Sequence, residues 1–418
     1  MTRIEAMAGS VRVARRAVQR IVLSLIVLGV ASSLGALPAG ASPTPGAVYA
    51  WFDNDAGQLG IGKCCTAYDS TTPVATLMPA RTTSTAVASG QSHSLAVTST
   101  GAVYAWGFNG RGQLGDGNTT NEDVPVQSRM PAGVTATAVA AGWDQSLALT
   151  STGAVYAWGY NVDGQLGIGT TKNSTVPVLV HLPAGVKATA IAAGQYHSLA
   201  ITSTGALYAW GYNADGELGT GTTKSSNVPV LVHLPAGVIA TADGAGDGHS
   251  LVVTSTGAIY GWGRNNFGQL GNGTTTPSLV PVLVHLPTGV KAAAVVAGGV
   301  SPTAKAPGAD YSLALTMNGA VYAWGGGSNG QLGTGGTASS SVPVRTKLPS
   351  GVIATAVGAG PNFGRALTST GGVYFWGSQA NGHDQHLVPA PTTLPSGLHG
   401  VAVSAGPDGE QILAVLVP

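Results

Sequence analysis

A Tyr-x-Trp pair recurs along this chain at a nearly constant spacing, and this repeat limits the possible folds more than any other feature. Seven copies are present, at Tyr49/Trp51, Tyr104/Trp106, Tyr156/Trp158, Tyr208/Trp210, Tyr260/Trp262, Tyr322/Trp324 and Tyr374/Trp376. Successive Trp residues are 55, 52, 52, 52, 62 and 52 residues apart, which defines a 52-residue unit with two short insertions. The 42 residues after the last Trp and the 10 residues from Ser42 to the first Trp together make one more unit. The sequence therefore predicts a closed ring of seven units, because an open solenoid would not require the ends to match.

Each unit contains four short apolar segments separated by Gly-bearing turns. In the unit from Val186 to Pro235 the expected strands are 188–192, 198–202, 206–210 and 228–232. Strand alternation puts Tyr208 and Trp210 on one face and other apolar residues on the opposite face, so both faces should be buried. The fourth segment contains a proline, which favours the outer edge of a sheet. Sheets that are buried on both sides by neighbouring sheets are the blades of a propeller.

We therefore predict an all-β, seven-bladed β-propeller of four-stranded antiparallel blades. The chain ends with the strand-like segments 401–403 and 412–415, and the first repeat begins with 48–51. These segments supply the inner, second and third strands of a single blade. Pairing of N-terminal and C-terminal strands in that blade should close the ring.

The first 41 residues differ from the repeats. Five arginines and one acid precede a run of apolar residues, 21–30, and the segment 39–41 is Ala-Gly-Ala. This order is typical of a secretory signal peptide, so we expect 1–41 to be a signal peptide and 42–418 to be a single propeller domain. The alternative is an uncleaved N-terminal helix that anchors the protein at the cell surface, although 17 residues before Pro38 are at the short limit for a span.

The charge of the chain argues against a nucleic-acid partner. Only 8% of residues are charged, the net charge is +1, and removal of 1–41 would leave a net charge of about −3. A nucleic-acid-binding protein needs basic stripes, which this sequence lacks. We expect a secreted, extracellular monomer with no membrane span after cleavage.

Two further motifs recur with the same period. Ala-Ala-Gly-Gln-Tyr-His-Ser-Leu-Ala-Ile stands at 192–201, and Gly-Tyr-Asn-Ala-Asp-Gly-Glu-Leu-Gly-Thr-Gly stands at 211–221. With their copies in the other units, they resemble the two signatures of regulator of chromosome condensation repeats, over residues 46–418. This resemblance implies a seven-bladed propeller closed by its termini.

The functions of known family members are diverse, so the resemblance alone does not select one. Members include a nuclear guanine-nucleotide exchange factor, a plant ultraviolet-B receptor with clustered Gly-Trp-Arg-His motifs, and a secreted bacterial β-lactamase inhibitor. This chain has only Gly142-Trp143-Asp144-Gln145 at such a position. Because of the signal peptide, we expect a secreted, bacterial-type member of this family. An exchange-factor-like regulator or a β-lactamase-inhibitor-like protein is the alternative.

Residues that recur in every unit should serve the structure, whereas residues found in one unit are candidates for function. His93, His197 and His249 each stand beside a serine, but the same position in other units holds Gln145, Tyr311 or Phe363. No acid accompanies these pairs consistently, so we interpret them as structural rather than catalytic. The chain is expected to be non-catalytic, with a hydrolase or lyase site at the axial opening as the alternative.

The departures from the repeat concentrate on one face of the predicted ring. This face, here called the loop face, carries the connections from first to second strand and from third to fourth strand; the opposite turn face repeats Thr-Ser-Thr-Gly and Leu-Pro-x-Gly. We predict that the loop face binds an unknown protein or glycan partner, with Trp143 and Phe363 as exposed aromatic anchors. Neutral drift of unconstrained loops is the alternative. The candidate contact residues are Trp143, Asp144, Phe363, Asp243, Asp247, Lys305 and Asp310.

Cys64 and Cys65 are the only cysteines. In an exported protein they could form a strained vicinal disulfide, pair between chains or stay reduced. The sequence contains no convincing metal-ligand set, and we expect no cofactor and no metal.

Overall fold

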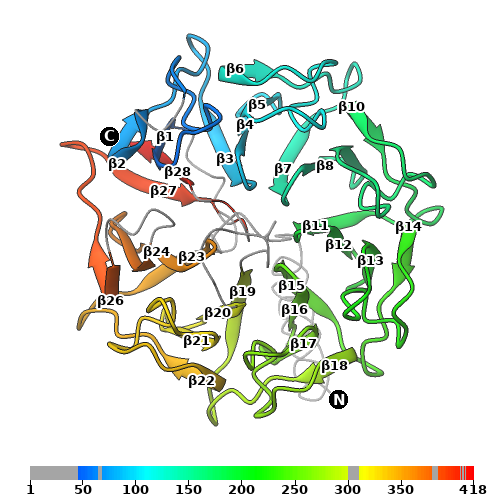
Figure 1. Cartoon of the computed structure of the whole chain (residues 1–418), viewed down its shortest axis with the longest axis vertical. Helices are drawn as coiled ribbons and strands as arrows, with labels where there is room; N and C mark the ends of the chain where they lie inside the picture. The colour runs from blue at the N-terminus through cyan, green and yellow to red at the C-terminus, as the bar shows by residue number, and fades with distance from the viewer. Residues whose placement is uncertain are drawn as a thin grey trace, which may run out of the picture.

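The structure is a ring of seven four-stranded sheets around a central axis (Figure 1). It is a computed structural model that describes residues 46–64, 68–299, 310–378, 385–404, 406, 409 and 411–418. Blade 1 consists of β27, β28, β1 and β2, and blades 2 to 7 follow in chain order with four strands each. In every blade the first strand lies nearest the axis and the proline-bearing fourth strand lies at the rim (Figure 1), which confirms the predicted fold class.

The strands have the following bounds. Blade 1 contains β27 (His399–Val403), β28 (Gln411–Val417), β1 (Ala47–Phe52) and β2 (Ser70–Ala75). Blades 2, 3 and 4 contain β3 (Ser84–Ser89), β4 (His93–Thr98), β5 (Val103–Gly107), β6 (Glu122–Gln127), β7 (Ala136–Ala141), β8 (Gln145–Thr150), β9 (Val155–Gly159), β10 (Ser174–Leu179), β11 (Ala188–Ala193), β12 (His197–Thr202), β13 (Leu207–Gly211) and β14 (Ser226–Leu231). Blades 5, 6 and 7 contain β15 (Ala240–Ala245), β16 (His249–Thr254), β17 (Ile259–Gly263), β18 (Ser278–Leu283), β19 (Ala292–Gly298), β20 (Tyr311–Thr316), β21 (Val321–Gly325), β22 (Ser340–Arg345), β23 (Ala354–Ala359), β24 (Phe363–Thr368), β25 (Val373–Ser378) and β26 (Gln385–Pro391).

Blade 1 closes the ring by joining the two ends of the chain. β1 pairs antiparallel with β28 over six residues, from Ala47 opposite Leu416 to Phe52 opposite Gln411. β28 in turn pairs with β27. The predicted closure by N-terminal and C-terminal strands is therefore present, and it makes the ring depend on contacts between residues far apart in the sequence.

Both faces of each blade are buried against neighbouring blades. In blade 4, Trp210 and Tyr208 pack against blade 3, whereas Leu207 and Ala209 pack against blade 5. This is the division that strand alternation predicts. The hydrophobic core is thus a circle of inter-blade layers rather than one central cluster.

The third-strand Trp side chains connect successive blades. In six blades the indole Nε1–H donates to a backbone carbonyl in the third-to-fourth-strand loop of the preceding blade, at 2.7–2.9 Å; the pairs are Trp106–Gln58, Trp158–Gln113, Trp210–Gln165, Trp262–Glu217, Trp324–Gln269 and Trp376–Gln331. Trp51 of blade 1 is also completely buried, but its Nε1–H has no hydrogen-bond partner among the described residues. The junction between blades 7 and 1 therefore differs from the other six.

The repeated histidines hold adjacent blades together. Nε2 of His93, His197 and His249 lies 3.0, 2.9 and 2.9 Å from a serine hydroxyl of the next blade. All three side chains are buried, and burial lowers the pKa of each imidazole to about 3. The structural interpretation of these residues is confirmed.

Over the described ranges, no helix is both long enough and apolar enough to cross a bilayer.

Candidate protein-interaction face

On the loop face, the residues that follow the third strands lie beside the residues that precede the second strands, and together they form two rows. Backbone hydrogen bonds fix their positions. The residue after the third strand donates its N–H to the carbonyl of the residue before the second strand of the same blade. Tyr160 bonds Asp144 in this way at 2.9 Å, and Tyr212 bonds Tyr196 at 2.9 Å. Because the repeat sets the backbone but not these side chains, each blade presents a different pair on this face.

Four aromatic side chains form a continuous patch across blades 3 and 4. Ring centroids are 5.1 Å apart for Trp143 and Tyr196, 5.9 Å for Tyr160 and Tyr196, and 6.3 Å for Tyr196 and Tyr212. All four are half-buried. We call these four residues the aromatic patch. Each ring has a neighbouring ring at stacking or edge distance, so the patch is held in place before any partner arrives.

Asp144 and Arg111 border the aromatic patch on the side of blade 2. Gln113 Nε2 donates to Asp144 Oδ1 at 2.6 Å, and the Arg111 guanidinium lies 5.5 Å from the centre of the Tyr160 ring. Burial raises the pKa of Asp144 to about 6, while Arg111 and the bond from Gln113 oppose this rise. Asp144 is therefore mostly a carboxylate at neutral pH and takes up a proton near pH 6, at the edge of an aromatic surface.

An ion cluster borders the patch on the other side. Arg264 contacts Asp215 and Asp247 at 2.8 Å each and Asp310 at 3.6 Å. Gln269 Nε2 also donates to Asp310 at 2.9 Å. These residues come from blades 4, 5 and 6, so one guanidinium connects three blades on the loop face.

The ion cluster is strongly perturbed by burial. Burial raises the pKa of Asp310, and the nearby Asp247 adds to this effect, while Arg264 opposes it. Burial also raises the pKa of Asp247 against the attraction of Arg264. Burial alone would lower the pKa of Arg264, but the three carboxylates raise it. Glu217, next to the cluster, has its pKa raised to about 8 by burial.

This geometry suits binding better than catalysis. Asp247 and Asp310 are 3% and 2% exposed, and Arg264 occupies the space where a substrate would have to approach them. Perturbed carboxyl groups can indicate an active site, but buried ion-pair networks shift pKa values in the same way. The exposed feature is the half-buried aromatic patch with fixed charges on both sides, a composition typical of protein interfaces.

Of the two aromatic residues predicted as exposed anchors, one is in the core and the other is half-buried. Phe363 is 1% exposed and packs against Phe52 and Phe375, with ring centroids 6.0 and 5.2 Å away. The prediction that it is an exposed anchor is wrong, because it is the first residue of β24 and not part of the preceding loop. Trp143 is half-buried rather than freely exposed, and its indole N–H has no partner.

Asp243 was also predicted on the loop face, and this placement is wrong. It lies within β15, is 1% exposed, and occupies the position that Ile191 and Val295 hold in the adjacent blades. Neither carboxyl oxygen has a hydrogen-bond partner. Burial raises the pKa of Asp243 to about 8, so it is a neutral acid in an apolar layer between blades at neutral pH.

Several other candidates cannot be located. Lys305, Cys65 and residues 379–384 lie outside the described residues, as do residues 1–45. Cys64 is half-buried in the third-to-fourth-strand loop of blade 1, and the disulfide hypothesis stays a prediction.

Sequence reasoning missed Tyr160, Tyr196, Tyr212 and Arg264. A usable signal existed, because the second residue after each Trp varies among the units although the Trp itself does not: it is Asp53, Phe108, Tyr160, Tyr212, Arg264, Gly326 and Ser378. Comparing that position across the repeat would have pointed to the rows described above.

A group of acids in blade 1 also escaped the sequence analysis. One carboxylate oxygen from each of Asp53, Asp55 and Asp69 lies within 4.8 Å of the others. Gln58 donates to Asp53, and the Asn54 N–H donates to Asp69 at 2.9 Å. Because exposed acids often lie this close without an ion, we assign no metal to them.

The fold and the loop face define a propeller of the repeat type whose distinctive residues gather on one face. The chain belongs to the RCC1-like domain family, which matches residues 47–409. The family resemblance deduced from the two repeat motifs is therefore confirmed.

Similar proteins include the Arabidopsis thaliana ultraviolet-B receptor UVR8, 34% identical over 71% of this chain and 64% of the receptor. The human E3 ubiquitin-protein ligase HERC2 is 33% identical over 70% of this chain, but over only 6% of the ligase. The chain thus spans less than two thirds of either relative. These relatives are eukaryotic and do not support the expectation of a bacterial-type member.

Solved structures with the same fold include human WBSCR16, with a TM-score of 0.76, 23% identity, and coverage of 89% of this chain and 98% of that one. Prp20p of Saccharomyces cerevisiae has a TM-score of 0.76 and 22% identity, and the match covers 92% of this chain and 93% of Prp20p.

Proposed function

We propose that this protein is an exported, non-catalytic scaffold that binds a protein partner through the loop face of blades 3 to 5. The observation that carries the proposal is the aromatic patch, in which Trp143, Tyr160, Tyr196 and Tyr212 form a chain of ring contacts between 5.1 and 6.3 Å. Trp and Tyr are the residues most enriched at the energetic centres of interfaces.

The surroundings of the patch fit an interface with fixed, directional contacts. Arg111 and Asp144 lie on one side, and Asp215 and Arg264 lie on the other. Val162, at 56% exposure in the same loop as Tyr160, adds apolar surface next to the patch. A peptide that carries apolar side chains and charges of both signs would match this arrangement, because two carboxylates and two guanidinium groups lie around the patch.

The export component rests on the N-terminal segment alone. Its basic, apolar and small-residue regions stand in the order of a cleaved signal. Residues 42–418 should be recovered outside the cell, and N-terminal sequencing should begin at Ser42. Recovery of the full chain from a membrane fraction would instead support the uncleaved anchor.

Site-specific photo-crosslinking tests the binding face. A photo-reactive residue at Val162 samples the loop face, and one at exposed Ala184 samples the turn face between the same two blades. We expect a defined crosslinked protein from the Val162 position and none of the same mass from the Ala184 position. Equal crosslinks from both positions, or none from Val162 in the protein's native surroundings, would contradict the proposal.

A further inference from the structure

Six inter-blade junctions are filled by a three-residue segment, Gln-Leu-Gly in five of them and Glu-Leu-Gly in the sixth, which shows what the fold needs at this place. The segments are Gln58-Leu59-Gly60, Gln113-Leu114-Gly115, Gln165-Leu166-Gly167, Glu217-Leu218-Gly219, Gln269-Leu270-Gly271 and Gln331-Leu332-Gly333. The carbonyl before each leucine accepts the Trp Nε1–H of the next blade, and each leucine side chain is at most 1% exposed.

The leucine carbonyl is bound as well where a hydroxyl follows the fourth strand. Thr76, Ser128 and Thr346 donate to the carbonyls of Leu59, Leu114 and Leu332 at 2.9, 2.7 and 3.0 Å. The backbone N–H of the next residue then donates to the glycine carbonyl, as Lys347 does to Gly333 at 2.9 Å. Each segment is therefore held by hydrogen bonds to its consecutive backbone carbonyls and by the packing of its leucine side chain.

The junction from blade 7 to blade 1 has no such segment. Six residues separate β25 from β26, whereas 14 residues separate β21 from β22, and no leucine occurs between Phe375 and His386. The groups that meet the segment elsewhere are nevertheless present. Trp51 keeps a buried Nε1–H without a partner, and Thr392 stands at the position of Thr346, after the fourth strand.

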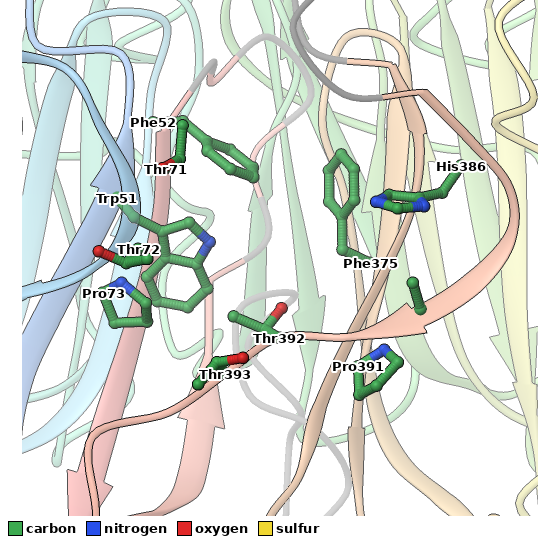
Figure 2. A pocket seen from close by; sticks show the side chains of 11 residues that line it. Trp51, Phe52, Thr71, Thr72, Pro73, Phe375, His386, Pro391, Thr392 and Thr393 are labelled. Atoms are coloured by element: carbon green, nitrogen blue, oxygen red, sulfur yellow. The ribbon is translucent and has the colours of Figure 1, made fainter.

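A pocket lies against Trp51 and Thr392, the residues equivalent to those that bind the segment at other junctions. Its volume is about 170 Å³, and its walls include Trp51, Phe52, Phe375 and Thr392. Figure 2 shows Trp51 and Phe52 on one side and Phe375 and His386 on the other. A cavity of about 150 Å³ accepts a benzene-sized molecule, so this one has room for a leucine side chain.

The walls of the pocket combine aromatic rings with the side chains of Thr71, Thr72, Thr392 and Thr393. Phe52 has a φ of 82° at a position where the other six blades have glycine, so its ring is held there against a backbone preference. Its ring centroid lies 5.2 Å from that of Phe375. Ile412 replaces the serine that donates to the segment in blades 2 to 6.

We propose that this pocket binds a leucine-containing peptide segment of a partner protein, which takes the place of the missing junction segment. The carbonyl before the leucine accepts from Trp51 Nε1, the leucine side chain enters the pocket against the Phe52 and Phe375 rings, and the leucine carbonyl accepts from the Thr392 hydroxyl. This site lies at blades 7 and 1, and the proposal does not depend on binding at the aromatic patch of blades 3 to 5.

The protein's own sequence provides the probe. The capped peptide Asn-Gly-Gln-Leu-Gly-Thr-Gly, residues 329–335, carries a complete junction segment. We would label it with a fluorophore and titrate it with the purified mature chain, following fluorescence anisotropy. We expect saturable binding, and a peptide with Leu→Asp should bind more than about tenfold more weakly, because its carboxylate would lose water against the Phe52 and Phe375 rings.

Matched variants locate the binding. Thr392→Val should weaken binding about fivefold, the loss typical of one neutral hydrogen bond, without lowering the unfolding midpoint. Thr346→Val, the same change at a filled junction, should lower the unfolding midpoint and leave peptide affinity unchanged, because its hydroxyl already binds Leu332. Trp51→Phe should also weaken binding. Equal affinity for the two peptides, or unchanged affinity in both Thr392→Val and Trp51→Phe, would overturn the proposal.

Discussion

At the scale of single residues, the most informative groups are those that interrupt the repeat inside the core. Asp243 occupies an apolar position between blades 4 and 5 and has no hydrogen-bond partner. Its pKa is about 8 in the folded protein, compared with about 3.9 in an unfolded chain. The folded state therefore holds a proton that the unfolded state releases, so the contribution of Asp243 is most favourable below pH 4 and is lost as pH rises to 8.

Asp243→Val should therefore stabilise the protein, and more so at pH 8 than at pH 4, with a difference on the order of a few kcal/mol. Urea unfolding at the two pH values measures it. Ile191→Val changes volume at the equivalent position of blade 4 and serves as the control, with no effect on pH dependence. A pH-independent effect of Asp243→Val would show that Asp243 is already ionised in the folded protein.

Arg264 is the counter-charge for two buried carboxylates. Arg264→Gln would leave Asp247 and Asp310 unpaired, which should destabilise the protein by about 3 kcal/mol at pH 7. The loss should be smaller at pH 5, because the carboxyl groups can then take up protons. Denaturant unfolding at both pH values checks this, with exposed Arg345→Gln as the control; a loss no larger than that of the control would mean that the cluster contributes little.

The sequence identified Asp243 as unusual but not its location. It was predicted, with Asp247, as a contact residue of the loop face, whereas the 52-residue period aligns it with Ile191 and Val295, which are strand residues. The prediction that Phe363 is exposed was wrong for a related reason, since one residue separates a loop position from the buried start of β24. Side-chain burial at loop boundaries depends on strand ends, which the sequence pattern does not resolve to one residue.

At the scale of elements, the period and alternation predicted the strands well. In blade 4 the expected 188–192 is observed as Ala188–Ala193, and the expected 228–232 as Ser226–Leu231. The contacts between blades could not be predicted, because they join the loop of one unit to the Trp of the next.

The Trp hydrogen bonds give an element-scale prediction. Trp158→Phe removes the bond to the Gln113 carbonyl, whereas Trp51→Phe removes an N–H that has no partner. The first change should cost about 1 kcal/mol more than the second, which is the typical net contribution of one hydrogen bond. Urea unfolding of both variants makes the comparison, and equal costs would show that the bond contributes nothing.

The buried histidines make the blade contacts sensitive to acid. His197 has a pKa of about 3 in the folded protein and about 6.5 when unfolded. The folded state therefore binds fewer protons, and the stability is full above pH 6.5 and is lost as pH falls towards 3.

His197→Gln should reduce this acid sensitivity, because Gln145 fills the same position in blade 3 and bonds Gly194 at 2.8 Å. Between pH 7.5 and pH 5 the variant should lose on the order of 2 kcal/mol less than the wild type. Exposed His181→Gln is the matched control and should behave like the wild type. Equal losses of stability in the wild type and both variants would contradict the lowered pKa of His197.

At the scale of the whole molecule, a closed ring presents two unlike faces. The turn face is nearly the same in every blade, whereas the loop face carries the aromatic patch, the ion cluster and the insertions. Ring closure by β1 and β28 holds these loops in fixed relative positions. A rigid display of loops from several blades is a suitable basis for recognising a protein surface.

The most direct test of the binding role is the affinity of the crosslinked partner for the purified ring, measured by calorimetry. Tyr160→Ala and Tyr212→Ala should each weaken binding by about tenfold or more, since truncation of a central interface aromatic typically costs 2 kcal/mol or more. Thr204→Ala on the turn face should leave the affinity unchanged. An affinity that is the same in the wild type and in both folded tyrosine variants would contradict binding through the loop face.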